Sequence, residues 1–112
     1  MEKISIQTEA RGTATVVTVS GRIDSETASK LDAELTSAVG GSANLVLEMQ
    51  GVDYMSSAGI RAIVKAAQAA EKKGGPVKMA SAPELVTSIF YTVGIVDKIK
   101  SYATVDEAIA SF

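Results

Sequence analysis

Apolar residues recur along the chain with two different spacings, and segments of the two kinds alternate. Ile4 and Ile6 are separated by polar residues, and the branched residues that follow a Gly-containing turn predict the second strand of a hairpin. Short apolar runs bounded by glycine or polar residues predict buried strands further along. The predicted strands are 4–8, 14–19, 44–49 and 77–80, followed by a short strand or extended connector at 95–99.

Helical spacing of apolar residues predicts four helices between and after these strands. The clearest carries Ile60, Ile63 and Ala67 on one face, with Lys65 on the other. The first is expected to run from Asp24 or Ser25, as N-cap, to Gly40–Gly41, and the second from about Ser57 to Lys73. The third is expected to run from a capping box at Ser81–Glu84 to Gly94, and the last from a capping box at Thr104–Glu107 through Ile109.

The order of these elements predicts an α/β fold. After the N-terminal antiparallel hairpin, strands and helices alternate, and right-handed crossovers place the following strands parallel in one mixed sheet with about four helices. The chain has 112 residues, enough for one core, and shows no linker or internal repeat. We therefore expect residues 1–112 to form a single domain.

Composition narrows the possible functions. A net charge of −2, with no basic cluster longer than Lys72–Lys73, argues against nucleic acid. Neither a membrane-spanning apolar run nor a signal-peptide core is apparent, so we expect a cytoplasmic protein that does not enter a membrane. Cysteine and histidine are both absent, which removes thiolate catalysis, the usual general base and the commonest metal ligand. We expect no cofactor, no metal and no enzymatic activity.

Two serines, Ser56 and Ser57, lie where a predicted strand passes into a predicted helix. The first backbone N–H groups of a helix have no partner within it, so a serine there can act as an N-cap. The same N–H groups and the helix dipole can also hold a phosphate, so the position suits a phosphorylation switch. Spacing alone leaves both interpretations open.

Several loops are expected to meet near these serines, because the carboxyl ends of parallel strands share one edge of a sheet. The polar residues brought together in this way are Arg22, Asp24, Asp53, Ser56, Ser57 and Ser81. Hydrolysis by Ser57 lacks a histidine base, and no phosphate-binding or dinucleotide-binding glycine motif occurs. The class of function that remains after these exclusions is a binding module. Its expected exposed rim consists of Asp24, Tyr54, Met55, Ser56, Ser57, Gly59, Ile60 and Arg61, with Met55 and Ile60 favoured as core residues.

The stretch Leu45–Arg61, with Ser56-Ser57-Ala58-Gly59 near its end, resembles the signature of the STAS domain, typified by bacterial anti-sigma factor antagonists. The upstream Gly21-Arg22-Ile23-Asp24 resembles a second marker of that family. Ser56 and Glu48 each stand at a position where many antagonists carry aspartate. The resemblance covers essentially the whole order of elements and implies a STAS-like sheet.

The resemblance also implies a mechanism. Ser57, or alternatively Ser56, would be phosphorylated by an anti-sigma factor that is also a serine kinase, and a PP2C-type phosphatase would remove the phosphate. The unphosphorylated form would sequester that partner, and the phosphorylated form would release it. The implied partner-binding residues are Arg22, Asp24, Tyr54, Ser56, Ser57, Gly59, Ile60 and Arg61.

Two expectations complete the sequence interpretation. An alternative function is a STAS module that acts as a scaffold or small-ligand sensor in a stress-signalling assembly, without serine phosphorylation. For Asp24→Ala, we expect weaker partner binding at an unchanged melting temperature, because Asp24 would lie on the partner-facing loop.

Overall fold

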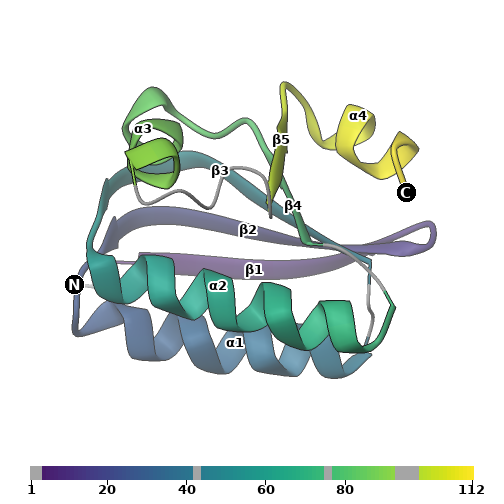
Figure 1. The fold of residues 1–112 in the computed structure, drawn as a ribbon, viewed down its shortest axis with the longest axis horizontal. Coiled ribbons are helices and arrows are strands. Elements are labelled where there is room, and N and C mark those ends of the chain that lie inside the picture. Colours follow the sequence, from purple (N-terminus) through teal and green to yellow (C-terminus); the bar gives the residue numbers. More distant parts are fainter. Residues whose placement is uncertain (1–3, 42–43, 75–76, 93–98) are drawn as a thin grey trace.

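The computed structural model describes residues 4–41, 44–74, 77–92 and 99–112. These residues form a five-stranded sheet in the spatial order β1-β2-β3-β4-β5, with four helices (Figure 1). The strands are β1 (Ile4–Arg11), β2 (Ala14–Ile23), β3 (Leu45–Met55), β4 (Val77–Ala80) and β5 (Lys100–Tyr102). The helices are α1 (Thr27–Gly41), α2 (Ser57–Lys72), α3 (Glu84–Thr92) and α4 (Val105–Ala110).

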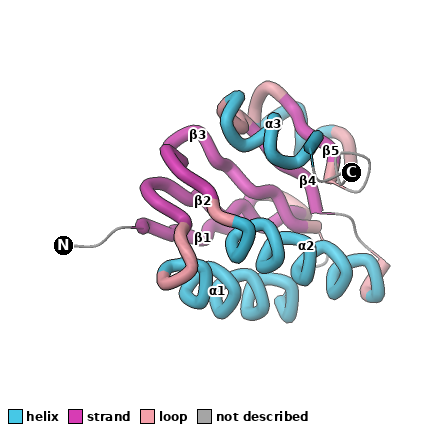
Figure 2. The backbone as a smooth tube through the Cα atoms, turned by 60° about the vertical axis from the view of Figure 1, so that its left-hand side comes forward, coloured by secondary structure: helices cyan, strands magenta, loops and turns pink. Residues whose placement is uncertain are grey.

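The predicted α/β architecture is confirmed. β1 pairs with β2 antiparallel, and β2, β3, β4 and β5 then pair in parallel. The helices α1 and α2 lie side by side along the sheet in both views (Figures 1 and 2). The strand or connector expected at 95–99 lies mostly outside the described residues, and β5 begins at Lys100.

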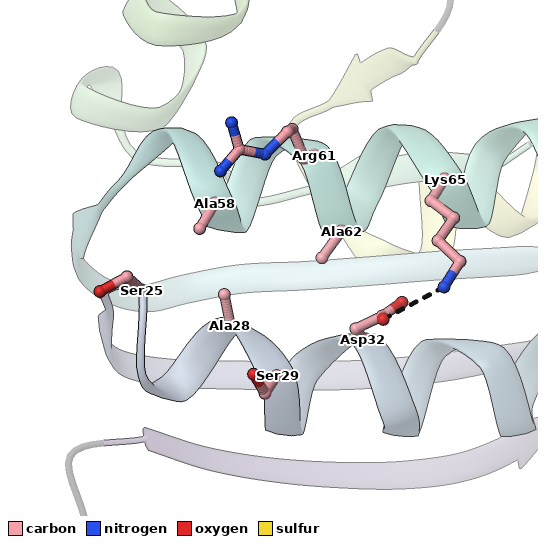
Figure 3. Close-up of a pocket in the computed structure, with 8 residues that line it drawn as sticks. All are labelled: Ser25, Ala28, Ser29, Asp32, Ala58, Arg61, Ala62 and Lys65. Atoms are coloured by element: carbon pink, nitrogen blue, oxygen red, sulfur yellow. Dashed lines mark hydrogen bonds and ion pairs between the residues drawn. The ribbon is translucent and has the colours of Figure 1, made fainter.

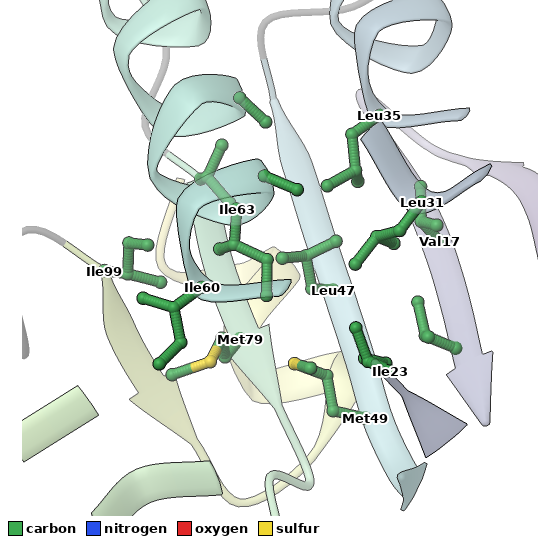
Figure 4. Packing of buried hydrophobic residues seen from close by; sticks show 14 of the residues in the cluster. Val17, Ile23, Leu31, Leu35, Leu47, Met49, Ile60, Ile63, Met79 and Ile99 are labelled. Carbon is green, nitrogen blue, oxygen red and sulfur yellow. The ribbon is translucent and has the colours of Figure 1, made fainter. Parts of the chain in front are cut away.

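Alternation along the strands divides the buried residues between the two faces of the sheet. The larger cluster includes Val17, Leu47 and Met79 from the strands and Leu31 and Ile63 from α1 and α2 (Figure 4). On the opposite face, α4 covers a smaller cluster. That cluster contains Ala14, Val16, Val46, Ala80 and Ala108.

The predicted ends of three strands were wrong, because β1 runs to Arg11 instead of residue 8, β2 runs to Ile23 instead of residue 19, and the end of β3 was also misplaced. β3 does not end near residue 49 but continues to Met55, where its last residues pair with the end of β2. The pairing shifts register between Thr18 and Ser20, and a Cβ on Gly51 would lie 2.6 Å from the Ser20 Cβ. The Gln50-Gly51 pair therefore marks an irregularity within the strand, where two backbones approach closely, rather than a turn that ends it.

The capping predictions had mixed outcomes. The Thr104 hydroxyl accepts a hydrogen bond from the Glu107 N–H at 3.1 Å and caps α4 as expected. Ser81 does not cap α3, because it has a left-handed backbone, with φ of 54°, and its hydroxyl donates to the Ala103 carbonyl. At the start of α3, the Val86 and Thr87 N–H groups donate to the Pro83 carbonyl instead.

Candidate phosphorylation and partner-binding site

The ends of β2 and β3 bring the Arg22–Asp24 loop beside the start of α2. Arg22 pairs with Tyr54 and Ile23 with Met55 in the parallel register. The Ser56 N–H donates to the Ile23 carbonyl at 2.7 Å, so this pairing continues into the residue that precedes α2. The loops that lead into α1 and α2 consequently lie together at one end of the sheet (Figure 2).

Ser56 and Ser57 occupy different environments at this junction. Ser56 has an extended backbone, and its half-buried hydroxyl accepts from the Gly59 N–H at 3.4 Å, so Ser56 is the N-cap. Ser57 is the first residue of α2, and its side chain is exposed. Its hydroxyl forms no hydrogen bond with any other residue that the structure describes. The capping role and the accessible hydroxyl are therefore divided between the two serines.

Asp24 organises the neighbouring loop. One of its carboxylate oxygens, Oδ1, accepts from the backbone N–H groups of Glu26 at 3.0 Å and Thr27 at 2.9 Å, and the Arg22 Nε donates to the other at 3.3 Å. Of the two predicted N-caps, Asp24 holds the first turn of α1. The Asp24 side chain is 18% exposed, so its charge remains accessible at the surface beside the more open Arg22.

Arg22 is held from a second side by an aromatic ring. Its guanidinium carbon lies 4.0 Å from the centroid of the exposed Tyr54 ring. Stacking of this kind and the contact with Asp24 restrict the orientation of the guanidinium. Together, Arg22, Asp24 and Tyr54 form a polar surface next to Ser56.

Gly59 and Ile60 do not lie on the exposed rim, which corrects the expectation for Gly59 and the partner-contact role implied for Ile60, whose burial in the core the sequence had favoured. Both residues are buried, Ile60 at 8% exposure, because the first turn of α2 packs directly on the end of β2. A Cβ on Gly59 would lie 2.5 Å from the Ile23 Cγ2 and 3.3 Å from the Met55 Cγ. Gly59 therefore permits close packing, and Met55 belongs to the core, as the sequence favoured.

Sequence reasoning missed Thr27. This buried residue donates through its hydroxyl to the Arg22 carbonyl at 2.7 Å and accepts from the Asp24 N–H at 2.8 Å. It closes the loop from inside and so positions both charged residues. The spacing Asp24-x-x-Thr27, typical of reciprocal capping at a helix start, was the available signal.

Of the two other residues expected near the serines, Ser81 lies apart from this group and Asp53 adds nothing to it. β4 ends opposite Glu48, well before the end of β3, so Ser81 does not reach Ser57. Asp53 is exposed on β3. Across the four described ranges, no group of three or more metal-ligating side chains occurs.

Arg61 lies on the rim of a groove between α1 and α2 (Figure 3). The groove has a volume of about 230 Å³, and its floor consists of small side chains, among them Ala28, Ala58 and Ala62. Further along its rim, Lys65 pairs with Asp32 at 3.2 Å. The site therefore continues from the polar loops into a shallow groove with charged walls.

The comparisons identify the family. The STAS domain model matches residues 5–108, so this chain belongs to the STAS domain family, and the resemblance seen in the sequence is confirmed. None of the curated proteins matches the chain significantly. Within the described ranges, every helix is too short or too polar to cross a bilayer.

Solved structures share the fold over nearly the full length. An anti-sigma factor antagonist from Mycobacterium paratuberculosis superimposes with a TM-score of 0.88 at 23% identity, covering 96% of this chain and 92% of that one. The Bacillus cell fate determinant SpoIIAA in its phosphorylated form gives 0.76 at 18% identity, covering 96% and 98%. An antagonist-like protein from Thermotoga maritima gives 0.83 at 16% identity, covering 95% and 92%. The chain therefore has the fold of anti-sigma factor antagonists.

Proposed function

We propose that this protein is an anti-sigma factor antagonist whose association with its partner is switched by phosphorylation of Ser57. The partner is an anti-sigma factor with serine kinase activity. The unmodified protein sequesters this partner, the phosphorylated protein releases it, and a PP2C-type phosphatase restores the first state. The observation that carries the proposal is the exposed, uncommitted Ser57 hydroxyl at the start of α2, beside the Arg22–Asp24 loop.

The division of roles between the serines favours Ser57 over Ser56. A phosphate on Ser56 would remove the hydroxyl that caps the Gly59 N–H and would enlarge a half-buried side chain. A phosphate on Ser57 leaves this cap in place and extends into solvent. The transferred group is the γ-phosphoryl of ATP, which forms a bond to the Ser57 oxygen as the bond to ADP breaks and the hydroxyl proton is lost.

The start of α2 suits an anion. The dipole of this helix places partial positive charge near Ser57, which stabilises a nearby phosphate without a change in the core. At neutral pH the modification adds about −1.5 to −2 charges to the surface. A dianion within an interface opposes binding through its desolvation cost and through repulsion of acidic groups on the partner.

The proposed contact surface consists of Arg22, Asp24, Tyr54, Ser56, Ser57 and Arg61. Each of them is at least partly accessible, whereas Gly59 and Ile60 support the surface from below. SpoIIAA, which shares the fold, is a protein known in a phosphorylated form, and this supports the same chemistry here.

Incubation with a candidate anti-sigma kinase and ATP, followed by mass spectrometry, tests the proposal. We expect phosphate on Ser57 in the parent and none in Ser57→Ala, which should still bind the partner. Ser57→Asp should bind more weakly, and Ser56→Ala should still be phosphorylated. Phosphate mainly on Ser56, or equal binding by the parent and Ser57→Asp, would contradict the proposal.

A further inference from the structure

Arg61 is an exposed cation beside the proposed modification site, and no counter-ion for it occurs among the residues that the structure describes. Of the neighbouring cations, Arg22 contacts Asp24 at 3.3 Å and Lys65 contacts Asp32 at 3.2 Å. Arg61 forms neither an ion pair nor a hydrogen bond with any residue in the described parts of the chain. Its guanidinium is therefore available to bind an anion, and no carboxylate of the described residues has to be displaced first.

The helix places Arg61 next to Ser57. The two residues are one turn apart on α2, about 40° around the helix axis, the spacing at which side chains of opposite charge pair. Side chains on a helix lean toward its N-terminus, and the Arg61 guanidinium extends in that direction, back over Ala58 (Figure 3). The later residue of the pair is thus directed at the earlier one.

We propose that Arg61 binds the phosphate on Ser57 within the same helix. The planar guanidinium donates two parallel hydrogen bonds to phosphate oxygens, the arrangement that distinguishes arginine from lysine. This inference rests on the proposed function only in taking Ser57 as the modified residue. Its consequence is that phosphorylation both adds a dianion and withdraws an exposed cation from the rim of the α1–α2 groove, so a carboxylate of the partner loses its counter-charge.

A titration of the full-length protein tests the pairing directly. Phosphoserine is installed at position 57 in the parent and in Arg61→Gln, and phosphorus NMR follows the second phosphate ionisation. An ion pair favours the dianion, so the second dissociation constant should be about 1.4- to 2.3-fold larger in the parent than in Arg61→Gln. Lys65→Gln, which removes a cation already paired with Asp32, should titrate like the parent.

A second control moves the phosphate. With phosphoserine at position 56, which precedes the helix, Arg61→Gln should leave the dissociation constant unchanged. Equal constants in the parent and Arg61→Gln at position 57 would overturn the pairing, as would an equal effect at both positions. Circular dichroism of each variant verifies that α2 is intact, which is expected because Arg61 is exposed.

The titration requires no kinase, so its failure is distinguishable from failure of the proposed function. If a kinase modifies Ser57 and binding is lost while Arg61→Gln leaves the titration unchanged, the pairing is wrong and the switch stands. If the titration shows the pair but no kinase modifies Ser57, the pairing stands and the proposed function is wrong.

Discussion

Gly59→Ala tests whether the start of α2 is positioned by contact with β2. In an ordinary helix this change stabilises by about 0.5–1 kcal/mol, because alanine loses less conformational entropy on folding. Here the added Cβ would lie 2.5 Å from the Ile23 Cγ2, so the two must separate by nearly 1 Å to reach the 3.4 Å of ordinary contact. Ile23 is fully buried and β-branched, so its side chain has little freedom to move away.

The expected net effect is destabilising. Overpacking of a buried site costs about 1–3 kcal/mol, which exceeds the gain in helix propensity. We expect Gly59→Ala to lower the free energy of unfolding by about 0.5–2 kcal/mol, and the melting temperature by about 3–10 °C. Urea denaturation followed by circular dichroism measures the first quantity.

Gly40→Ala is the matched control. Gly40 lies within α1, and a Cβ there would meet no atom within 4 Å, so this change should stabilise by about 0.5–1 kcal/mol. Ile23→Leu shifts the branch away from Gly59, so combining it with Gly59→Ala should cost less than the two single changes together. Equal stabilisation by Gly59→Ala and Gly40→Ala would refute the reasoning.

Three further predictions concern stability and titration. Ser56→Ala should lower the free energy of unfolding by about 0.5–1 kcal/mol and Ser57→Ala by less than about 0.5 kcal/mol, because only Ser56 caps α2. Equal losses of unfolding free energy in urea denaturation would contradict this assignment of the cap. Asp24→Ala should lower the free energy of unfolding by about 1–2 kcal/mol, because Asp24 caps α1, and this replaces the expectation of an unchanged melting temperature. Asp24→Asn should keep the cap and remove the charge, so weaker partner binding by Asp24→Asn would isolate the electrostatic role of Asp24. The Ser111 hydroxyl and the Lys78 charge hold the pKa of Tyr102 below its usual 10.0, so ionisation of this phenol stabilises the folded state. The stabilisation is present above pH 10.0 and is lost as the pH falls through the pKa that Tyr102 has in the folded protein. With Tyr54 and Tyr91 replaced by phenylalanine, absorbance of the remaining phenolate should show Tyr102 titrating at higher pH in Lys78→Met, and an unchanged curve would rule out the charge effect.

Periodicity in the sequence was sufficient for the order and type of the elements. The hairpin, the parallel strands and the helix that begins at Ser57 are all confirmed, because burying one face imposes its spacing on each segment. The motif around Ser56-Ser57 also led to the STAS family, which the family comparison confirms. These conclusions depend on local spacing, which a sequence displays directly.

Pairing between distant segments required the three-dimensional structure. Gln50, Gly51 and Asp53 have the composition of a turn, yet they extend β3 because β2 supplies hydrogen-bond partners over the same length. β4 has no such extension, which separates Ser81 from the site.

The roles of the two adjacent serines were likewise indistinguishable from their spacing. The backbone pairing of Ser56 with Ile23 makes Ser56 the cap and leaves the Ser57 hydroxyl exposed. Close contact between Gly59 and Ile23 then buries Gly59, which the pattern placed on the rim. A linear pattern records which residues favour burial or capping, but only the packing of β2 against α2 decides which hydroxyl an enzyme or a partner can reach.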